Sequence, residues 1–424
     1  MFRSLAGLNY RIWFFGALVS NVGTWMQRTA QDWIVLTELT HNNATAVGIT
    51  MALQFGPQLV MLPITGWAAD RFDRRKMLMC TQAAMAVLGA ALGIMTLTGV
   101  VVLWHVYVFA LLLGIAAAFD APARQSFVGE LVDERNLSNA VALNSTSFNA
   151  ARTIGPAIAG LMTAWVGAGP VFIINAVTFI AVLLSLKFMR QSEFNARGRG
   201  SRRGGGLVEG FRYVRTRPDL IVIFIMVFLI GTFGLNFPIF TSTMASSVFG
   251  KGAGEFGVLS SVMAVGSVVG SLLAARREKP RVSMLFLGAL AFGLGCALAA
   301  VMPTYWLFGA SLALIGLFSQ TLMTTANGTV QLATEPAVRG RVMAIYMAIF
   351  MGGTPIGAPI VGWVADAWGA RWGLGVGAAS GILAGAVGVF YLMKYRGLRM
   401  RVNRWRPMLV MEEPEAARPE VAAA

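Results

Sequence analysis

The chain has 424 residues, of which 56% are hydrophobic and only 12% are charged. Soluble domains carry about 25% charged residues, so this composition excludes an ordinary soluble protein and indicates a polytopic membrane protein. The net charge of +15 is not a nucleic-acid signal, because the basic residues lie in short segments between apolar runs. We therefore expect membrane topology to explain the excess of Lys and Arg, and we expect no nucleic-acid partner.

Enzymatic chemistry has little support in the sequence. Two Cys and two His residues offer neither a disulfide framework nor the spacing of a metal site. The nucleotide-binding pattern Gly-x4-Gly-Lys-Ser/Thr is absent. We expect no enzyme activity, no metal and no cofactor, so energy for transport would come from ion or substrate gradients.

Apolar runs divide the chain into spans. Because a membrane-spanning helix needs roughly 20 apolar residues, the sequence predicts an all-α membrane protein of twelve transmembrane helices. The first run is long enough to be a retained helix instead of a cleaved signal peptide. The predicted spans are about 9–36, 47–69, 77–97, 103–120, 139–166, 171–189, 220–249, 256–275, 282–301, 305–328, 342–365 and 372–395.

The basic residues fall almost entirely on one side of these spans. Only Lys251 and Arg371 lie in segments assigned to the other side, while Arg28 and Arg152 lie within spans. Short loops rich in Lys and Arg stay cytoplasmic. We therefore predict a multi-pass protein of the inner (plasma) membrane with both termini in the cytoplasm.

Four segments make up the predicted organisation. Residues 1–190 form an N-terminal six-helix bundle, 191–218 a cytoplasmic basic linker, 219–395 a C-terminal six-helix bundle, and 396–424 a cytoplasmic tail predicted to be disordered. The Arg-, Gly- and Ser-rich composition of the linker is typical of a flexible connection. Its arginines either hold anionic lipid headgroups or serve topology alone.

A dense charge cluster lies between the second and third spans. It runs from Gly66 to Lys76 and reads Gly-Trp-Ala-Ala-Asp-Arg-Phe-Asp-Arg-Arg-Lys. In spacing and type it resembles the signature loop of the major facilitator superfamily, with Asp73 where that pattern has Gly. The matching residues are Gly66, Asp70, Arg71, Arg74 and Arg75.

The resemblance implies a conformational gate in this loop. Asp70 would dock on the start of the eleventh span near Arg341, where a helix N-terminus stabilises a carboxylate. Arg74 would pair with Asp120 at the end of the fourth span. These contacts would latch the cytoplasmic side while the protein faces outward. The alternative is that the cluster only anchors the topology.

Glycine and proline recur at matching places in the two halves. Gly155, Pro156 and Gly160 in the fifth span correspond to Gly357, Pro359 and Gly362 in the eleventh. Small residues allow close helix approach and Pro interrupts the hydrogen-bond ladder. The first group resembles the helix-bend signature of drug and proton antiporters in the superfamily, and a generic packing motif is the alternative. The fourth span lacks the embedded Arg of those antiporters.

Polar side chains within spans are the candidates for substrate binding or proton coupling. They include Asn21, Arg28 and Asp32 in the first span and Asn144 and Arg152 in the fifth. Arg28 and Asp32 are four residues apart and share a helix face. They form either a neutralised pair or a proton-titrating Asp32 with Arg28 as its modulator. Arg152 either pairs with a carboxylate such as Asp120 or faces the cavity.

A finer resemblance narrows the expected function. Segments such as Gly23-Thr-Trp-Met-Gln and Asn139-Ala-Val-Ala-Leu-Asn resemble the branch of enterobactin exporters and macrolide efflux proteins. This implies export of a bulky amphipathic small molecule, a drug or siderophore, by alternating access and proton antiport. The expected partners are the substrate, protons and membrane lipids, and we expect a monomer. A proton-coupled importer and a non-transporting sensor of the same fold are the alternatives.

Overall fold

The computed structural model describes residues 3–194, 207–275, 282–336, 338–395, 398–403 and 406–411. Almost all of them are helical. The first half contains η1 (Arg3–Ala6), α1 (Leu8–Ile34), η2 (Val35–Leu39), α2 (Ala44–Val60), α3 (Leu62–Arg71), α4 (Arg74–Leu97), α5 (Leu103–Val128), α6 (Glu134–Val166) and α7 (Ala168–Phe188). The second contains α9 (Pro218–Leu229), η4 (Ile230–Gly234), α10 (Phe237–Thr243), η5 (Met244–Val248), α11 (Ala253–Ala275), α12 (Val282–Val301), α13 (Tyr305–Ala333), α14 (Arg339–Trp368) and α15 (Ala370–Tyr395).

Every predicted span coincides with a helical segment. Among the described residues, nine segments are long and apolar enough to cross a membrane, and the bent pair of α2 and α3 makes a tenth. The other two long helices, α1 and α6, are less apolar because they contain the charged residues Arg28, Asp32 and Arg152. The all-α, twelve-helix prediction is confirmed.

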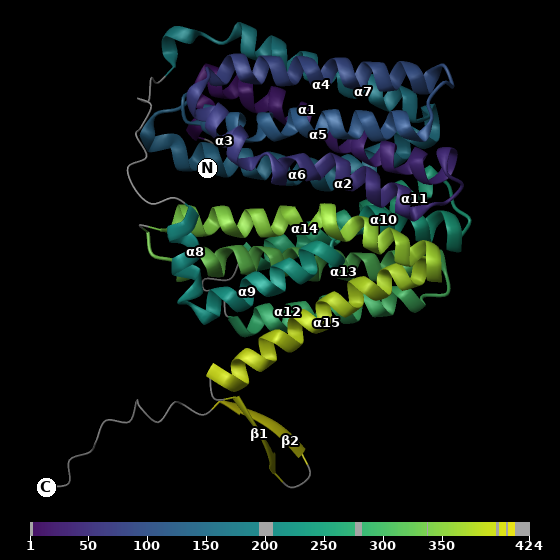
Figure 1. Ribbon diagram of the computed structural model, residues 1–424, viewed down its shortest axis with the longest axis vertical. Helices are drawn as coiled ribbons and strands as arrows, with labels where there is room; N and C mark the ends of the chain where they lie inside the picture. The colour runs from purple at the N-terminus through teal and green to yellow at the C-terminus, as the bar shows by residue number, and fades with distance from the viewer. Residues whose placement is uncertain are drawn as a thin grey trace, which may run out of the picture.

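The helices form two six-helix halves that lie one above the other in Figure 1. Within the first half α1 packs against α6 and α7, and α4 against α7; within the second, α11 packs against α13, and α12 against α15. Between the halves the extensive contacts are α2 with α14 and α6 with α11. The space between the halves is therefore flanked by these two helix pairs.

One predicted span is broken. The axis turns by 57° at Met61, between α2 and α3, where Pro57 lies in the last turn of α2 and Pro63 in the first turn of α3. Proline removes a backbone donor and clashes with the preceding turn, which accounts for the break. By contrast, α6 and α14 continue as single helices through Pro156 and Pro359.

The linker and tail are described only in part. Next to residues 195–206, which lie outside the described residues, are the short η3 (Gln191–Glu193) and α8 (Leu207–Arg215). The tail was predicted to be disordered, and this is wrong for β1 (Leu398–Asn403) and β2 (Arg406–Met411), which pair antiparallel with Leu398 opposite Met411. Leu398, Met400 and Val402 alternate with polar residues, which is the strand period. Residues 412–424 lie outside the described residues.

The two ends of the bundle differ in charge. The basic end is where α3 and α7 end and α4, α9 and α14 begin; Arg75, Arg190, Arg217 and Arg341 lie there. The far end is where α2 and α11 begin and α6 and α14 end. Figure 1 shows the basic end on the left, with α3 and α8, and the far end on the right.

Candidate functional site

The two halves are in close contact at the far end. A Cβ atom on Gly48 of α2 would lie 2.8 Å from the Cα of Pro359, and one on Gly362 of α14 would lie 2.9 Å from the Cα of Thr45. A Cβ on Gly160 of α6 would lie 2.5 Å from the backbone N of Gly257 in α11. Only glycine permits backbones to approach this closely. Of the predicted Gly-Pro motifs, Gly160 and Gly362 therefore lie at packing contacts between the halves, whereas Gly155 packs against Trp25 and Gly357 against Thr232 within their own halves.

A second contact at the far end is polar. The carboxylate of Asp366, near the end of α14, accepts hydrogen bonds from the backbone N–H groups of Ala44 and Thr45, both at 2.7 Å, and from the Thr45 hydroxyl at 2.5 Å. These N–H groups belong to the first turn of α2, which has no intrahelical acceptor for them and favours negative charge. Asp366 thus joins the second half to the first. We call this contact the far-end latch.

The sequence contained a signal for this latch. Gly362-Trp-Val-Ala-Asp366 repeats the pattern of Gly66-Trp-Ala-Ala-Asp70. The first segment lies near the end of α14 and the second near the end of α3. The second and eleventh spans pack against each other in opposite directions, so the two segments lie at opposite ends of the bundle. Comparison of the two segments would have identified Asp366, which sequence analysis missed.

Toward the basic end the halves separate. The face of α14 that contacts α2 at Gly352 and Gly362 continues to Met347 and Met351, which are exposed because α2 bends away at Met61. Beside the contact of α6 with α11, on the side of α6 that contains the exposed Ile154, a groove of about 340 Å³ is separate from the space between the halves. Its lining residues are Thr153, Ile154, Ala157, Ser261, Ala264, Val265, Val268 and Val269. The structure is thus closed at the far end and open toward the basic end.

The interior contains buried polar atoms without hydrogen-bond partners. Gln31 is fully buried, and Gln54 and Asp32 are nearly fully buried. The side-chain amide atoms of Gln31 and Gln54 and the Oδ1 atom of Asp32 have no hydrogen-bond partner among the described residues. Buried polar groups are normally paired. Gln31 and Asp32 lie on α1 and Gln54 lies on α2, so both helices contain buried polar atoms without a partner among the described residues.

Arg28 and Asp32 do not form an ion pair in the described structure. The Arg28 guanidinium instead lies over the rings of Trp25 at 5.2 Å and Phe55 at 4.6 Å. Both alternatives for these two residues, a neutralised pair and a proton-titrating Asp32, stay predictions. Asn21 lies on the same face of α1, nearly buried. The proton-coupling role of Asp32 stays a prediction.

Arg152 has no hydrogen bond or ion pair with any described residue. The predicted alternative partner, Asp120, is occupied by Arg124, Thr81 and Gln82. Of the two alternatives for Arg152, pairing with Asp120 is wrong. Asn144, the other candidate on α6, is half-buried nearer the basic end.

The buried carboxylate Asp120 forms a network within the first half. Its Oδ2 accepts from Arg124 Nε at 2.8 Å, and its Oδ1 accepts from Thr81 Oγ1 at 2.9 Å and Gln82 Nε2 at 2.7 Å. The predicted pair of Arg74 with Asp120 is wrong, since Arg74 pairs with Glu130. The physical reason is that α5 continues to Val128 instead of ending at Asp120, so Arg124 lies one helical turn away.

The rest of the signature loop fixes the start of α4. Arg75 donates to the carbonyl of Leu186 at 2.9 and 2.7 Å, and Asp73 caps α4 by accepting from Lys76 N–H at 2.8 Å. Arg71 lies over Trp67 at 5.7 Å. Gly66 has open space where a Cβ would lie. The side chain of Asp70 lies outside the described residues, so its docking on α14 stays a prediction.

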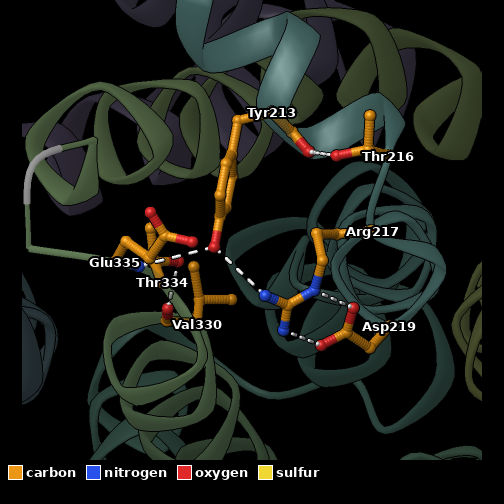
Figure 2. A network of polar contacts seen from close by, with 7 residues as sticks. All are labelled: Tyr213, Thr216, Arg217, Asp219, Val330, Thr334 and Glu335. Atoms are coloured by element: carbon orange, nitrogen blue, oxygen red, sulfur yellow. Dashed lines mark hydrogen bonds and ion pairs between the residues drawn. The ribbon is translucent and has the colours of Figure 1, made fainter.

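The linker helix α8 meets the second half at the basic end. Glu209 forms a 2.9 Å ion pair with Arg341 at the start of α14. Figure 2 shows Tyr213 of α8 receiving a hydrogen bond from Arg217, which also holds Asp219 at 2.7 Å. The Tyr213 hydroxyl also accepts from the backbone N–H of Glu335, beyond the end of α13. Thus α8 is tied to the starts of α9 and α14.

The seventh span is interrupted by π-helical turns. Between α9 and α10, η4 places the fully buried Thr232 against Gly353 and Gly357 of α14. Asn236 follows, and its Oδ1 is buried without a partner among the described residues. Such turns are frequent at functional sites, and interrupted spans often line the substrate path of transporters.

Two helical halves, a polar interior and an opening at one end define a membrane transporter with the major facilitator fold. The chain belongs to the transmembrane secretion effector family of the major facilitator superfamily, whose model matches residues 2–421. In fold it is similar to a bacterial homologue of the human lysosomal transporter Spinster, solved in an inward-facing conformation, with a TM-score of 0.73 and 14% identity over 90% of this chain and 97% of that one.

Curated relatives resemble the chain over most of its length. The Staphyloferrin A transporter of Staphylococcus aureus is 28% identical, with 80% of this chain and 85% of that protein covered. The multidrug efflux pump Tap of Mycolicibacterium fortuitum is 27% identical, with 89% and 94% covered. The enterobactin exporter EntS of Shigella boydii is 26% identical, with 73% and 74% covered. The superfamily and the exporter branch predicted from sequence are confirmed.

Proposed function

We propose that this transporter exports a bulky amphipathic small molecule from the cytoplasm by alternating access, in exchange for protons. The observation that carries the proposal is the arrangement of unpartnered polar groups on α1, α2 and α6 directly below a closed far end. The relatives named for export of enterobactin and for multidrug efflux support the outward direction. The Staphyloferrin A transporter adds a second siderophore to the class.

The basic end faces the cytoplasm in this proposal. Its loops contain nearly all the basic residues, which stay cytoplasmic during membrane insertion. The structure then represents the state that admits substrate from the cytoplasm. Release requires the far-end latch of Asp366 to open and the basic end to close, with Asp70 docking on the start of α14 as the resemblance implies.

Asp32 is the proposed site of proton coupling. It is the one carboxylate in the middle of the described bundle, because Asp120 is held by Arg124 toward the basic end. An intramembrane carboxylate with an unpartnered oxygen is a default candidate for proton transfer. Its neighbour Arg28, one turn away, would sense its charge.

A proton-gradient assay in inverted membrane vesicles tests the proposal. Macrolides, catechol siderophores, dyes and sugars are added in turn, with the wild-type protein, Asp32→Asn and Asp70→Asn. We expect an amphipathic compound to collapse the gradient in wild-type vesicles and to fail in the variants. Substrate movement that is unchanged in Asp32→Asn would contradict the coupling role, and movement only toward the cytoplasm would favour the importer.

A further inference from the structure

The middle of the bundle has an excess of positive charge. Arg28, Asp32 and Arg152 are the charged residues there; all others of the described helices lie near helix ends or, as with Asp120 and Arg124, in a paired network. With Asp32 ionised the three sum to one positive charge, and with Asp32 protonated to two. We infer that the transported substrate is an amphipathic anion whose acidic group is bound by Arg28 and Arg152.

The helix face that contains Arg152 points into the interior. At 100° per residue, Arg152 lies about 60° from Gly155 and about 80° from Gly160 on the opposite side. Gly155 packs against Trp25 of α1, and Gly160 against Gly257 of α11. Arg152 therefore lies in the sector between the faces that contact α1 and α11.

The lipid-facing side of α6 lies opposite. Ile154, Leu161 and Trp165 have exposed fractions of 48%, 44% and 87% and lie about 180° to 220° around the helix from Arg152. Arg152 lies on the opposite side of α6 from these residues. It is eight residues before Gly160, so its position along the helix axis is roughly 12 Å from the far-end contact of Gly160, toward the basic end. Arg152 is thus placed at the closed head of the opening, where a substrate entering from the basic end stops.

Arg28 is presented with its donors free. Trp25 and Phe55 lie against the guanidinium at 5.2 and 4.6 Å, and Arg28 donates no hydrogen bond among the described residues. Aromatic rings engage the face of the guanidinium plane, whereas its five N–H groups point outward in that plane. That edge matches two oxygens of a carboxylate or sulfonate. The two rings also supply apolar surface for the substrate body.

A cation is disfavoured at the same place. No charged side chain of the second half lies in the middle of its described helices, so Asp32 alone would have to offset a cationic substrate and both arginines. Like charges in a region of low dielectric cost several kcal/mol in general. The charge balance therefore selects for anions among amphipathic solutes.

Thermal stabilisation of the purified full chain tests this inference. Amphipathic aromatic anions, such as anilinonaphthalene sulfonate, are compared with the uncharged phenylnaphthylamine and with the cation ethidium. We expect the anions to raise the melting temperature and the cation to leave it unchanged. In Arg152→Gln and Arg28→Gln the affinity for the anion should fall by about tenfold or more. Arg152→Lys should retain part of the affinity. The control is Arg190→Gln, which changes an exposed arginine at the basic end and should behave as wild type.

Three results would overturn the inference. In the first, only cations or neutral compounds raise the melting temperature, and in the second no anion of the series raises it. In the third, anions raise the melting temperature equally in the wild type and in both Gln variants. The inference rests on the proposed export but fails separately from it. If vesicles expressing the protein move cations with an intact dependence on Asp32, export stands and the anion assignment falls. If anions bind through Arg28 and Arg152 yet are not moved, the binding site stands and export falls.

Discussion

Asp366 of the second half accepts hydrogen bonds from Thr45 of the first half, from its backbone N–H at 2.7 Å and from its hydroxyl at 2.5 Å. One residue supplies the end of α14 and the other the start of α2, so the contact exists only while the far end is closed. Its chemistry is that of a helix cap. A cap donated across an interface can open without unfolding either helix, which suits a gate.

Replacing Asp366 with Ala should favour opening of the far end. A lost capping interaction costs about 1 to 2 kcal/mol, which corresponds to a shift of about five- to thirtyfold in the ratio of closed to open molecules. Spin labels at His41 and Trp372, on the two halves near this end, should then report an added population at longer distance. The control is Asn43→Ala, which removes a cap of α2 within its own half; a distance distribution that responds equally to both changes would argue against a latch.

Gly160→Val should prevent the far end from closing. A Cβ at this position meets the backbone N of Gly257 at 2.5 Å and the carbonyl of Ala253 at 3.0 Å, so backbone and not a movable side chain must give way. We expect loss of transport with normal amounts of protein in the membrane. Gly340→Ala, where the added Cβ has open space, should transport normally. Full activity in Gly160→Val would show that this closure is not needed.

The partner of Arg74 can be identified by double-mutant cycles. Arg74 should couple to Glu130 by up to about 1 kcal/mol, the range for partly exposed pairs, and should not couple to Asp120. Unfolding of the purified chain in detergent gives the free energies. Coupling to Asp120 in place of Glu130 would contradict the geometry at the basic end.

Asp120→Asn should lower stability more than it lowers transport per folded molecule. The Asp120 side chain is 8% exposed and that of Arg124 13%, and removing one member of a buried pair costs about 3 to 5 kcal/mol because the other charge is left unpaired. We expect a clear drop in melting temperature. Adding Arg124→Gln should restore part of it, and a double variant less stable than either single variant would count against the pairing.

Asp70→Asn should reduce transport without reducing the amount of protein in the membrane. In the proposed cycle the Asp70 carboxylate binds the start of α14 when the basic end closes. Loss of this carboxylate should therefore destabilise the outward-facing state without affecting the state in which the basic end is open. Transport assays and immunoblots of the same vesicles measure both quantities. Unchanged transport would mean that the loop anchors topology only.

How far the sequence predicts this molecule differs between its parts. The spans follow from hydrophobic length, and the charge cluster after Gly66 from its cost in hydrocarbon. The partner of Asp120 does not follow from the sequence in this way, because α5 continues through a polar stretch beyond the apolar run and brings Arg124 beside Asp120. Contacts between distant segments, such as Asp366 with α2, depend on how the halves pack, and periodicity along one helix contains no information on that packing.

Labelling of two single-cysteine variants tests most directly whether the interior opens alternately to the two ends. In a background with Cys80→Ser and Cys296→Ser, Ser145→Cys reports the exposed face of α6 and Ala358→Cys the fully buried contact of α14 with α2. Without substrate, a membrane-impermeant maleimide should react rapidly with the Ser145→Cys variant from the cytoplasmic side and not with the Ala358→Cys variant. A transported substrate should make the thiol of Ala358→Cys reactive from the opposite side. Reaction of that thiol without substrate, or of neither thiol under both conditions, would contradict alternating access.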